Sequence, residues 1–397
     1  MPRALLLPLA LPLLLVACGS GQETDTSDEA QEPSIDELRS LPYLGFTGEA
    51  DEDESGTVHF DPERSSPGYN LYTVRQLSMA ELVDARGEVV RRWTGPPGRW
   101  ARVQLLDNGD LLIVGKDDVR YVMRQTWGGE VLWRHDLPSH HDIRLTPDGH
   151  VATLTLYERS LPAITTKVPV RDDAVTVFDG PTEEILDEAS LYDVLHDGGF
   201  DFQFVAPDPK VGHVDLLHAN SVRWMTDPDL FGRDRIYEAG NVIVSIRHQD
   251  TISIFDFDDR ELLWAWGQGE ISGPHDAHVL ANGNLLIFDN GLGRDWSRVI
   301  ELDPLRREIV WSYRAPHPYD FYTRGRGSNQ RLPNGNTLIT ESDTGRVFEV
   351  TPDGEVVWEY FSPHFRNEKR ATLVRCYRIG TDLVERLVAE HRETGRR

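Results

Sequence analysis

The chain reads Thr-Pro-Asp-Gly-Glu-Val-Val-Trp over residues 351–358, and this stretch decides the fold because it recurs along the sequence. Its copies end at Trp93, Trp133, Leu186, Trp264, Trp311 and Trp358. A second hairpin follows each copy, with turns such as Asn108-Gly109 between alternating apolar residues. Asn-Gly and Asp-Gly turns favour tight hairpins because both residues adopt positive φ readily. Two hairpins in each unit of roughly 40 to 50 residues are typical of a four-stranded propeller blade.

The two ends of the chain are needed to complete the last unit. The six marker residues delimit five complete units, and a sixth requires one strand from 371–377 together with strands from 70–93. Pairing of the first and last segments in one blade removes open sheet edges. The sequence therefore predicts an all-β fold, a six-bladed β-propeller over 66–380 whose termini close one blade. The repeated tryptophans are expected to pack the blades.

The first 18 residues have the pattern of an export signal. Arg3 precedes an apolar run over 4–16, and small residues lead to Cys18. The run is too short to span a membrane as a stable helix. Because a cysteine stands at the cleavage point, 1–18 resembles a bacterial lipoprotein signal peptide. This resemblance implies that Cys18 becomes the lipidated first residue of a lipoprotein in the cell envelope, at the outer membrane or the periplasmic side.

Residues 19–65 contain 14 Asp or Glu against two arginines. Such a composition buries too little apolar surface to offset the entropy of ordering, so we predict an acidic, disordered linker there. Residues 381–397 are predicted to form a short C-terminal helix and tail that dock on a blade. The net charge of −25 argues against nucleic acid as a partner. Cys376 is the only thiol besides Cys18, so no internal disulfide is expected.

Three histidines occupy what we interpret as one slot of the repeat. His141 and His275 each lie eight residues before the hairpin glycine of their copy, and His218 begins a third copy whose hairpin is longer. Equivalent slots of a propeller surround one axis, so we expect the three imidazoles to converge. Other copies have Ala101 and Gly327 in this slot, so packing does not require an imidazole there.

Arg247 joins this set from the strand that returns after the third hairpin. Imidazoles beside a guanidinium suggest a pocket for a tetrahedral anion, which arginine binds through paired donors. A metal site is the competing interpretation. However, His275 and His278 are three positions apart on a strand and should face opposite sides, and Arg247 would repel a dication. We therefore predict no metal, and we expect His140, His248 and His278 to point away from the pocket.

The chain resembles the arylsulfate sulfotransferase (aryl sulfotransferase) family, six-bladed propeller enzymes of the bacterial envelope. The motifs that carry the resemblance lie at 139–143, 217–222, 244–249, 273–277, 288–291 and 330–338. The resemblance implies an enzyme that moves a sulfuryl group from a phenolic sulfate ester to a phenol by a ping-pong mechanism. No nucleotide sulfate donor and no cofactor are expected.

The resemblance also implies roles for individual residues. His275 matches the histidine that is transiently sulfurylated, while His141, His218 and Arg247 match residues that surround the sulfate. A neutral imidazole can attack sulfur, a fixed guanidinium stabilises the developing charge, and His218 is suited to move the phenolic proton. His141 is expected to hydrogen-bond the sulfate.

Two asparagines complete the predicted site. Asn220 is expected to orient His218 or the sulfate, or else to serve as a turn residue, and Asn290 is expected to bind substrate. The better-known family members have a disulfide near the active site and an N-terminal β domain used in dimerisation. This chain lacks both patterns, so its oligomeric state and natural substrates are not predicted. The alternative is a non-catalytic, quinoprotein-like propeller lipoprotein that serves as an envelope scaffold or binding module.

Overall fold

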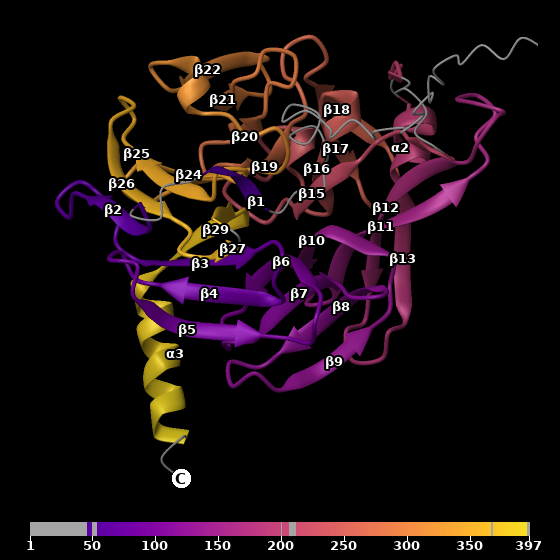
Figure 1. The fold of residues 1–397 in the computed structure, drawn as a ribbon. Coiled ribbons are helices and arrows are strands. Elements are labelled where there is room, and N and C mark those ends of the chain that lie inside the picture. The colour runs from indigo at the N-terminus through magenta and orange to yellow at the C-terminus, as the bar shows by residue number, and fades with distance from the viewer. Residues whose placement is uncertain (1–45, 50–53, 200, 206–211, 367, 395–397) are drawn as a thin grey trace, which may run out of the picture.

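Six antiparallel sheets surround a common axis in the computed structural model, which describes residues 46–49, 54–199, 201–205, 212–366 and 368–394 (Figure 1). The prediction of a six-bladed β-propeller is therefore confirmed. Each blade is built from four strands whose first member lies innermost, and two of the blades gain a fifth strand. Among the described residues, no helix combines the length and the apolar character that crossing a bilayer requires.

The strands follow the repeat of the sequence. Blade 1 contains β29 (Leu373–Ile379), β3 (Tyr69–Val74), β4 (Met79–Val83) and β5 (Val89–Thr94). Blade 2 contains β6 (Arg99–Leu105), β7 (Leu111–Lys116), β8 (Arg120–Gln125) and β9 (Val131–His135). Blade 3 contains β10 (Ser139–Leu145), β11 (Val151–Arg159), β12 (Val170–Phe178) and β13 (Ile185–Ser190), with β14 (Val214–Asp215) added in parallel to β12.

The remaining blades continue in the same order. Blade 4 contains β15 (Ala219–Trp224), β16 (Asn241–Ile246), β17 (Thr251–Asp256) and β18 (Leu262–Trp266). Blade 5 contains β19 (His275–Val279), β20 (Leu285–Asp289), β21 (Arg298–Asp303) and β22 (Glu308–Tyr313). Blade 6 contains β23 (Ser328–Arg331), β24 (Thr337–Glu341), β25 (Arg346–Val350) and β26 (Val356–Phe361).

Short elements connect and cover the blades. The helices are α2 (Leu191–Asp197), α3 (Thr381–Thr394) and the 3₁₀ turns η1 (Arg235–Tyr237), η2 (Arg247–Gln249) and η3 (Pro318–Asp320). A separate small sheet is formed by β1 (Phe46–Glu49), β28 (Lys369–Ala371) and β27 (Phe365–Arg366).

The two ends of the chain close blade 1 as predicted. The C-terminal strand β29 pairs antiparallel with β3, with Tyr377 opposite Leu71 and Cys376 opposite Tyr72. Cys376 is a buried free thiol. The closing strand lies innermost, so it also contributes side chains to the axis of the propeller.

The predicted disordered linker 19–65 is wrong at its C-terminal end. Strand β2 (Gly56–Phe60) pairs with β26 as a fifth strand of blade 6, and β1 pairs with β28. The prediction rested on composition, but pairing with a sheet edge uses backbone N–H and C=O groups and does not require an apolar sequence. Residues 1–45, with the predicted signal peptide and Cys18, lie outside the described residues.

The repeated tryptophans join each blade to the next. Trp264, Trp311 and Trp358 donate their indole N–H groups to the carbonyls of Pro304, Pro352 and Ala85, at distances of 3.0, 2.8 and 2.7 Å. Each carbonyl belongs to the turn between the third and fourth strands of the following blade. The predicted packing role is confirmed. The indole hydrogen bond explains the tryptophan at these three positions, whereas the buried Nε1 of Trp93 has no hydrogen-bond partner among the described residues.

The C-terminal helix α3 docks on blades 1 and 2, as predicted. Val384 and Leu387 are fully buried in a cluster that includes Trp93 and Trp127, and the ring of His391 stacks on Trp127. Leu387 also contacts the hairpin at Gly109. This places α3 at the end of the propeller where the inner hairpins turn (Figure 1).

Changing Leu387 to Ala should lower the free energy of unfolding by about 2–5 kcal/mol, because the cavity left beneath the helix cannot be refilled by neighbouring strands. Chemical denaturation of the variant measures this loss. The exposed neighbour Glu385 provides the control, since Glu385→Ala should leave the denaturation midpoint nearly unchanged. Equal midpoints for both variants would contradict the docking of α3.

Candidate active site

The histidines predicted to converge do so at the end of the axis opposite α3. His141 lies near the start of β10, His218 directly precedes β15, and His275 begins β19. The ring centroids of His141 and His218 are 5.1 Å apart. After burial, the nearness of His275 contributes to the lowered pKa of His141, and that of Arg247 to the lowered pKa of His275. The structure thus brings the four expected residues together.

The three histidines do not share one slot, however. His141 and His275 lie four positions before the last paired residue of their inner strands, whereas His218 lies six positions before Trp224. The fourth position in blade 4 is Asn220, where the strand bulges. The longer hairpin of this blade hid the offset from sequence counting. The bulge and the left-handed backbone of His218 accompany this offset, and the His218 ring still lies beside that of His141.

His275 is held as a neutral imidazole with a defined tautomer. Its Nδ1 lies 2.7 Å from Asn290 Oδ1 and 2.9 Å from the Gly273 carbonyl, so Nδ1 carries the proton. The lone pair is then on Nε2, which accepts a hydrogen bond from the backbone N–H of Arg326 at 3.1 Å. Burial, followed by the charge of Arg247, lowers the pKa of His275 to about 3. The ring is therefore neutral at ordinary pH, with a lone pair on Nε2.

Asn290, which was expected to bind substrate, supports His275 through its side chain. Its Nδ2 donates to the carbonyls of Thr323 and Arg326 at 2.8 and 2.6 Å, while Oδ1 faces His275. The side chain is fully buried. All its hydrogen-bonding groups are used within the protein, which makes Asn290 a positioning residue.

Asn220 also acts on His275 rather than on His218. Its Nδ2 donates to the carbonyl of Pro274, the residue before His275, at 2.9 Å. Its own carbonyl accepts a hydrogen bond from Arg375. The buried side chain therefore fixes the segment that leads to His275. It makes no hydrogen bond to His218, since its Oδ1 has no partner among the described residues, and a contact with sulfate stays a prediction.

Asp215, which the sequence analysis missed, fixes His218. The Asp215 carboxylate lies 2.8 Å from Nδ1 of His218, so Nδ1 carries a proton and Nε2 is left for proton exchange. Asp215 is in β14, a two-residue strand that adds to blade 3 outside the repeat. The only signal in the sequence is a carboxylate three residues before the histidine.

His248 was expected to point away from the pocket, and this is wrong. Its ring centroid lies 4.7 Å from that of His218. Its Nδ1 is 2.7 Å from the Asp215 carbonyl, and its Nε2 accepts from Nη1 of Arg247 at 2.8 Å. The reason is local: residues 247–249 form the 3₁₀ turn η2, so the alternation of a strand does not apply. Burial lowers the pKa of His248 to about 4, which keeps it a neutral acceptor for the guanidinium.

His140 and His141 form a pair joined by a hydrogen bond between their rings. Their Nδ1 atoms are 2.7 Å apart, and Nε2 of His140 lies 3.0 Å from a carboxylate oxygen of Asp173. Nε2 of His140 donates to the Thr155 carbonyl at 3.3 Å, so its Nδ1 accepts from His141. This leaves Nε2 of His141 as an acceptor. Burial lowers the pKa of His141 well below its usual value. As expected, His140 supports the pocket from behind.

A group with the composition of a metal site is present, but it is already engaged. Asp215, His218 and His248 offer ligand atoms within 4.8 Å of one another. The guanidinium of Arg247 donates to His248, and a positive charge at that place would repel a dication. The hydrogen bonds of the three groups to one another and to Arg247 account for their positions.

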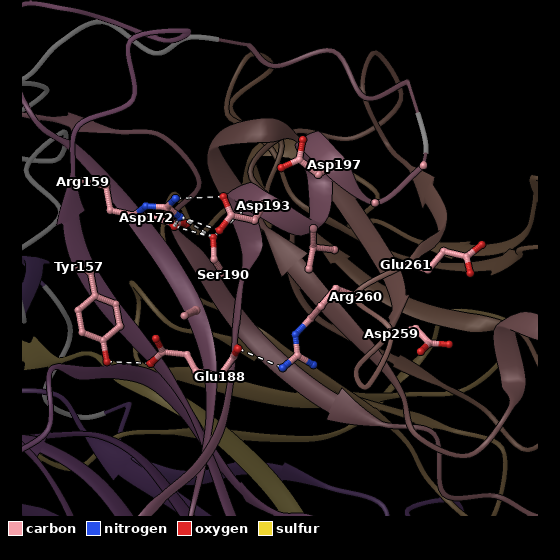
Figure 2. Close-up of a pocket in the computed structure, with 14 residues that line it drawn as sticks. Tyr157, Arg159, Asp172, Glu188, Ser190, Asp193, Asp197, Asp259, Arg260 and Glu261 are labelled. Carbon is pink, nitrogen blue, oxygen red and sulfur yellow. Dashed lines mark hydrogen bonds and ion pairs between the residues drawn. The ribbon is translucent and has the colours of Figure 1, made fainter.

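A pocket of about 810 Å³ lies elsewhere, on the outer side of the propeller beside α2 (Figure 2). Its walls are rich in carboxylates, and its arginines are paired: Arg159 with Asp172 and Asp193, and Arg260 with Asp187. None of the converging histidines lines it. This large pocket is therefore not the candidate active site. The candidate site is identified by the histidines and the arginine that converge on the axis of the propeller.

Three comparisons with known proteins bear on the family of the chain. Solved structures that resemble the chain are a protein of unknown function from Bacteroides caccae (14% identity, 78% of this chain and 100% of that chain, TM-score 0.48), the Dos1 propeller (12%, 81% and 76%, 0.41) and the dihydro-heme d1 dehydrogenase NirN in complex with DHE (11%, 84% and 81%, 0.44). A search of the curated proteins found no significant match. A family model described as arylsulfotransferase (ASST) matches residues 102–363. Because this match spans more than half of the 397 residues and includes every residue of the candidate site, the chain belongs to the arylsulfotransferase family.

Proposed function

We propose that the protein transfers a sulfuryl group from a phenolic sulfate ester to a phenolic acceptor through a covalent intermediate on His275. Membership of the arylsulfotransferase family supports sulfuryl transfer as the reaction. The observation that carries the finer proposal is the state of His275. It is buried and neutral, with its proton fixed on Nδ1 and its lone pair on Nε2 beside Arg247.

The first half-reaction forms the intermediate. Nε2 of His275 attacks sulfur, the N–S bond forms, and the bond from sulfur to the phenolic oxygen breaks. The departing phenolate takes the bonding electron pair and receives a proton from Nε2 of His218 when that ring is protonated. Asp215 stabilises the resulting charge distribution because it accepts from Nδ1 of His218 in both states.

The second half-reaction reverses these steps with another phenol. His218 removes the acceptor's proton, the phenolic oxygen attacks sulfur, and the N–S bond returns its electrons to His275. One nucleophile thus serves both halves, as a ping-pong path requires. No nucleotide donor or cofactor takes part in either step.

The equatorial sulfate oxygens need fixed positive groups during both steps. Arg247 is held by His248 and by the carbonyl of Arg324, so its charge is already in place. The backbone N–H of Arg326, which faces Nε2 of His275, can donate to a sulfate oxygen once attack has begun. Nε2 of His141 carries a lone pair, so it is suited to accept a hydrogen bond from the hydroxyl group of the phenol that receives the sulfuryl group. This role differs from the expected contact with sulfate.

A direct assay tests the proposal. The full chain, incubated with a chromogenic aryl sulfate and a phenol, should release the chromogenic phenol and form the new aryl sulfate in equal amounts. Varying both substrates should give the parallel double-reciprocal lines of a ping-pong path. Release without transfer would show a sulfatase, and no release from a folded protein would favour the scaffold alternative.

We also propose that the protein is an exported bacterial lipoprotein, held to a membrane of the cell envelope through Cys18. The pattern of residues 1–18 supports this. Changing Cys18 to Ser should move the protein from the membrane fraction to the soluble fraction, or leave its signal uncleaved. Normal processing and membrane retention of this variant would reject the lipid anchor.

A further inference from the structure

The end of the axis near α3 carries a second ring of polar side chains that the proposed reaction does not use. Each blade contributes one residue, and the pairing registers place all six at one level: Gln104, Arg144, Arg223, His278, Gln330 and Tyr377. All six are partly exposed, as are the residues at the ends of their inner strands. The ring therefore lines the second mouth of the channel.

A layer of buried ion pairs separates this ring from the histidines. Asp142 accepts from Arg102 at 3.0 Å and from Arg375 at 3.2 Å, and Arg375 reaches Asp276 at 3.4 Å. Tyr377 donates to the Asp276 carboxylate from the ring below. Because all the charged groups of this layer are 5% exposed or less and come from four blades, the pairs cross the axis and divide the channel.

Positive charge exceeds negative charge around the ring. Four guanidiniums (Arg102, Arg144, Arg223 and Arg375) share the two carboxylates Asp142 and Asp276. Three of them contact the face of Tyr377, with guanidinium carbons 4.4, 5.9 and 5.7 Å from the ring centroid. His278, the remaining titratable member, adds no charge, since burial lowers its pKa to about 4.

Arg144 is paired with a shared carboxylate, but two of its donor atoms have no hydrogen-bond acceptor among the described residues. These atoms are the buried Nε and Nη2, and Nε lies 3.4 Å from Asp142. Nε of Arg223 is also buried and donates no hydrogen bond to a described residue. Burial and the charges of Arg102 and Arg223 lower the pKa of Arg144 to about 9. Buried cationic donors without acceptors are costly, and an oxyanion would supply both the acceptors and the charge.

We propose that this mouth of the channel binds a small inorganic oxyanion, sulfate or phosphate, between Arg144 and Arg223. The planar guanidiniums offer paired donors suited to a tetrahedral anion. The site is distinct from the one at His275 because the layer of ion pairs lies between them. Its occupation would neutralise the excess charge at the centre of the propeller and so stabilise the ring of blades.

Thermal unfolding with added sulfate or phosphate tests this site apart from the histidine site. All measurements use the full chain carrying Arg247→Gln, which weakens anion binding at the histidines. In this background, sulfate should raise Tm with a saturable dependence. Adding Arg144→Gln should raise the half-saturating concentration by about tenfold or more, as expected for lost charge-assisted hydrogen bonds. Adding Arg86→Gln instead, which removes an exposed arginine, should have no such effect.

The sign of the effect without anion provides a second readout. In low-salt buffer lacking sulfate and phosphate, Arg144→Gln should raise Tm, because it removes one of the four guanidiniums that share two carboxylates. A saturable response that is unchanged by Arg144→Gln would overturn the proposal, as would a response reproduced by sodium chloride at equal ionic strength. Sulfate and phosphate are titrated separately, and the one with the lower half-saturating concentration is the preferred ion. Turnover enters none of these measurements, so the result is independent of the proposed reaction.

Discussion

His275→Asn protein should form no covalent adduct and should lose phenol sulfation by a factor on the order of 10⁴ or more, because no other group in the pocket replaces the attacking lone pair. In the unchanged protein, an aryl sulfate supplied without acceptor should place one sulfuryl group on Nε2, since Asn290 and Gly273 occupy Nδ1. Mass spectrometry of the peptide that contains residue 275 measures the adduct.

The pH of this experiment follows from the state of the ring. The pKa of His275 is lowered to about 3, so the nucleophile is neutral above that value and is lost only as the pH falls through it. A decline of activity between pH 7 and 5 would then be caused by the protonation of another group. The adduct itself should be trapped at neutral or alkaline pH, because protonation of the imidazole makes it a better leaving group.

His278→Asn is the matched control, because it makes the same change on the same strand outside the histidine pocket. It should keep turnover within a few fold. Substantial phenol sulfation by the His275→Asn protein would end the covalent mechanism. An adduct that persists at another histidine would transfer the role of nucleophile to that residue.

The sequence predicted the fold well because the repeat encodes direct contacts between blades. In three copies the tryptophan donates a hydrogen bond to the turn of the next copy, so both partners recur together in the sequence. Strand β2 was not predicted because its pairing with β26 uses only backbone groups. An acidic composition excludes a hydrophobic core, but it does not exclude a strand that adds to an existing edge.

The site was predictable as a set of residues but less so as an arrangement. Repeat positions identified the three histidines, yet the longer hairpin of blade 4 concealed a two-residue offset at His218. The place of His248 depends on a single 3₁₀ turn, and that of Asp215 on a two-residue strand. Neither element has a repeat or periodicity that marks it, because both are fixed by tertiary pairing.

Asp215→Asn should slow sulfuryl transfer selectively for donors whose phenols are poor leaving groups, by about 10² to 10⁴-fold in kcat. A nitrophenyl sulfate should react at nearly the original rate in its first half-reaction, because its phenolate departs without a proton. The reason is that Asp215 holds Nδ1 of His218 and so presents Nε2 for proton transfer. His218→Ala should show the same selectivity, and the double variant should be no slower than His218→Ala alone.

The dependence on the leaving group separates this role from a structural one. A series of aryl sulfates of rising phenol pKa should give a steeper fall in kcat for Asp215→Asn than for the unchanged protein. Asp229→Asn, which alters an exposed aspartate in the loop after β15, should leave the slope unchanged. If Asp215→Asn reduced all donors by one common factor, the carboxylate would only support the fold. Asp215 is the residue through which β14 contacts His218. Such a result would therefore mean that β14 contributes to the fold and not to proton transfer.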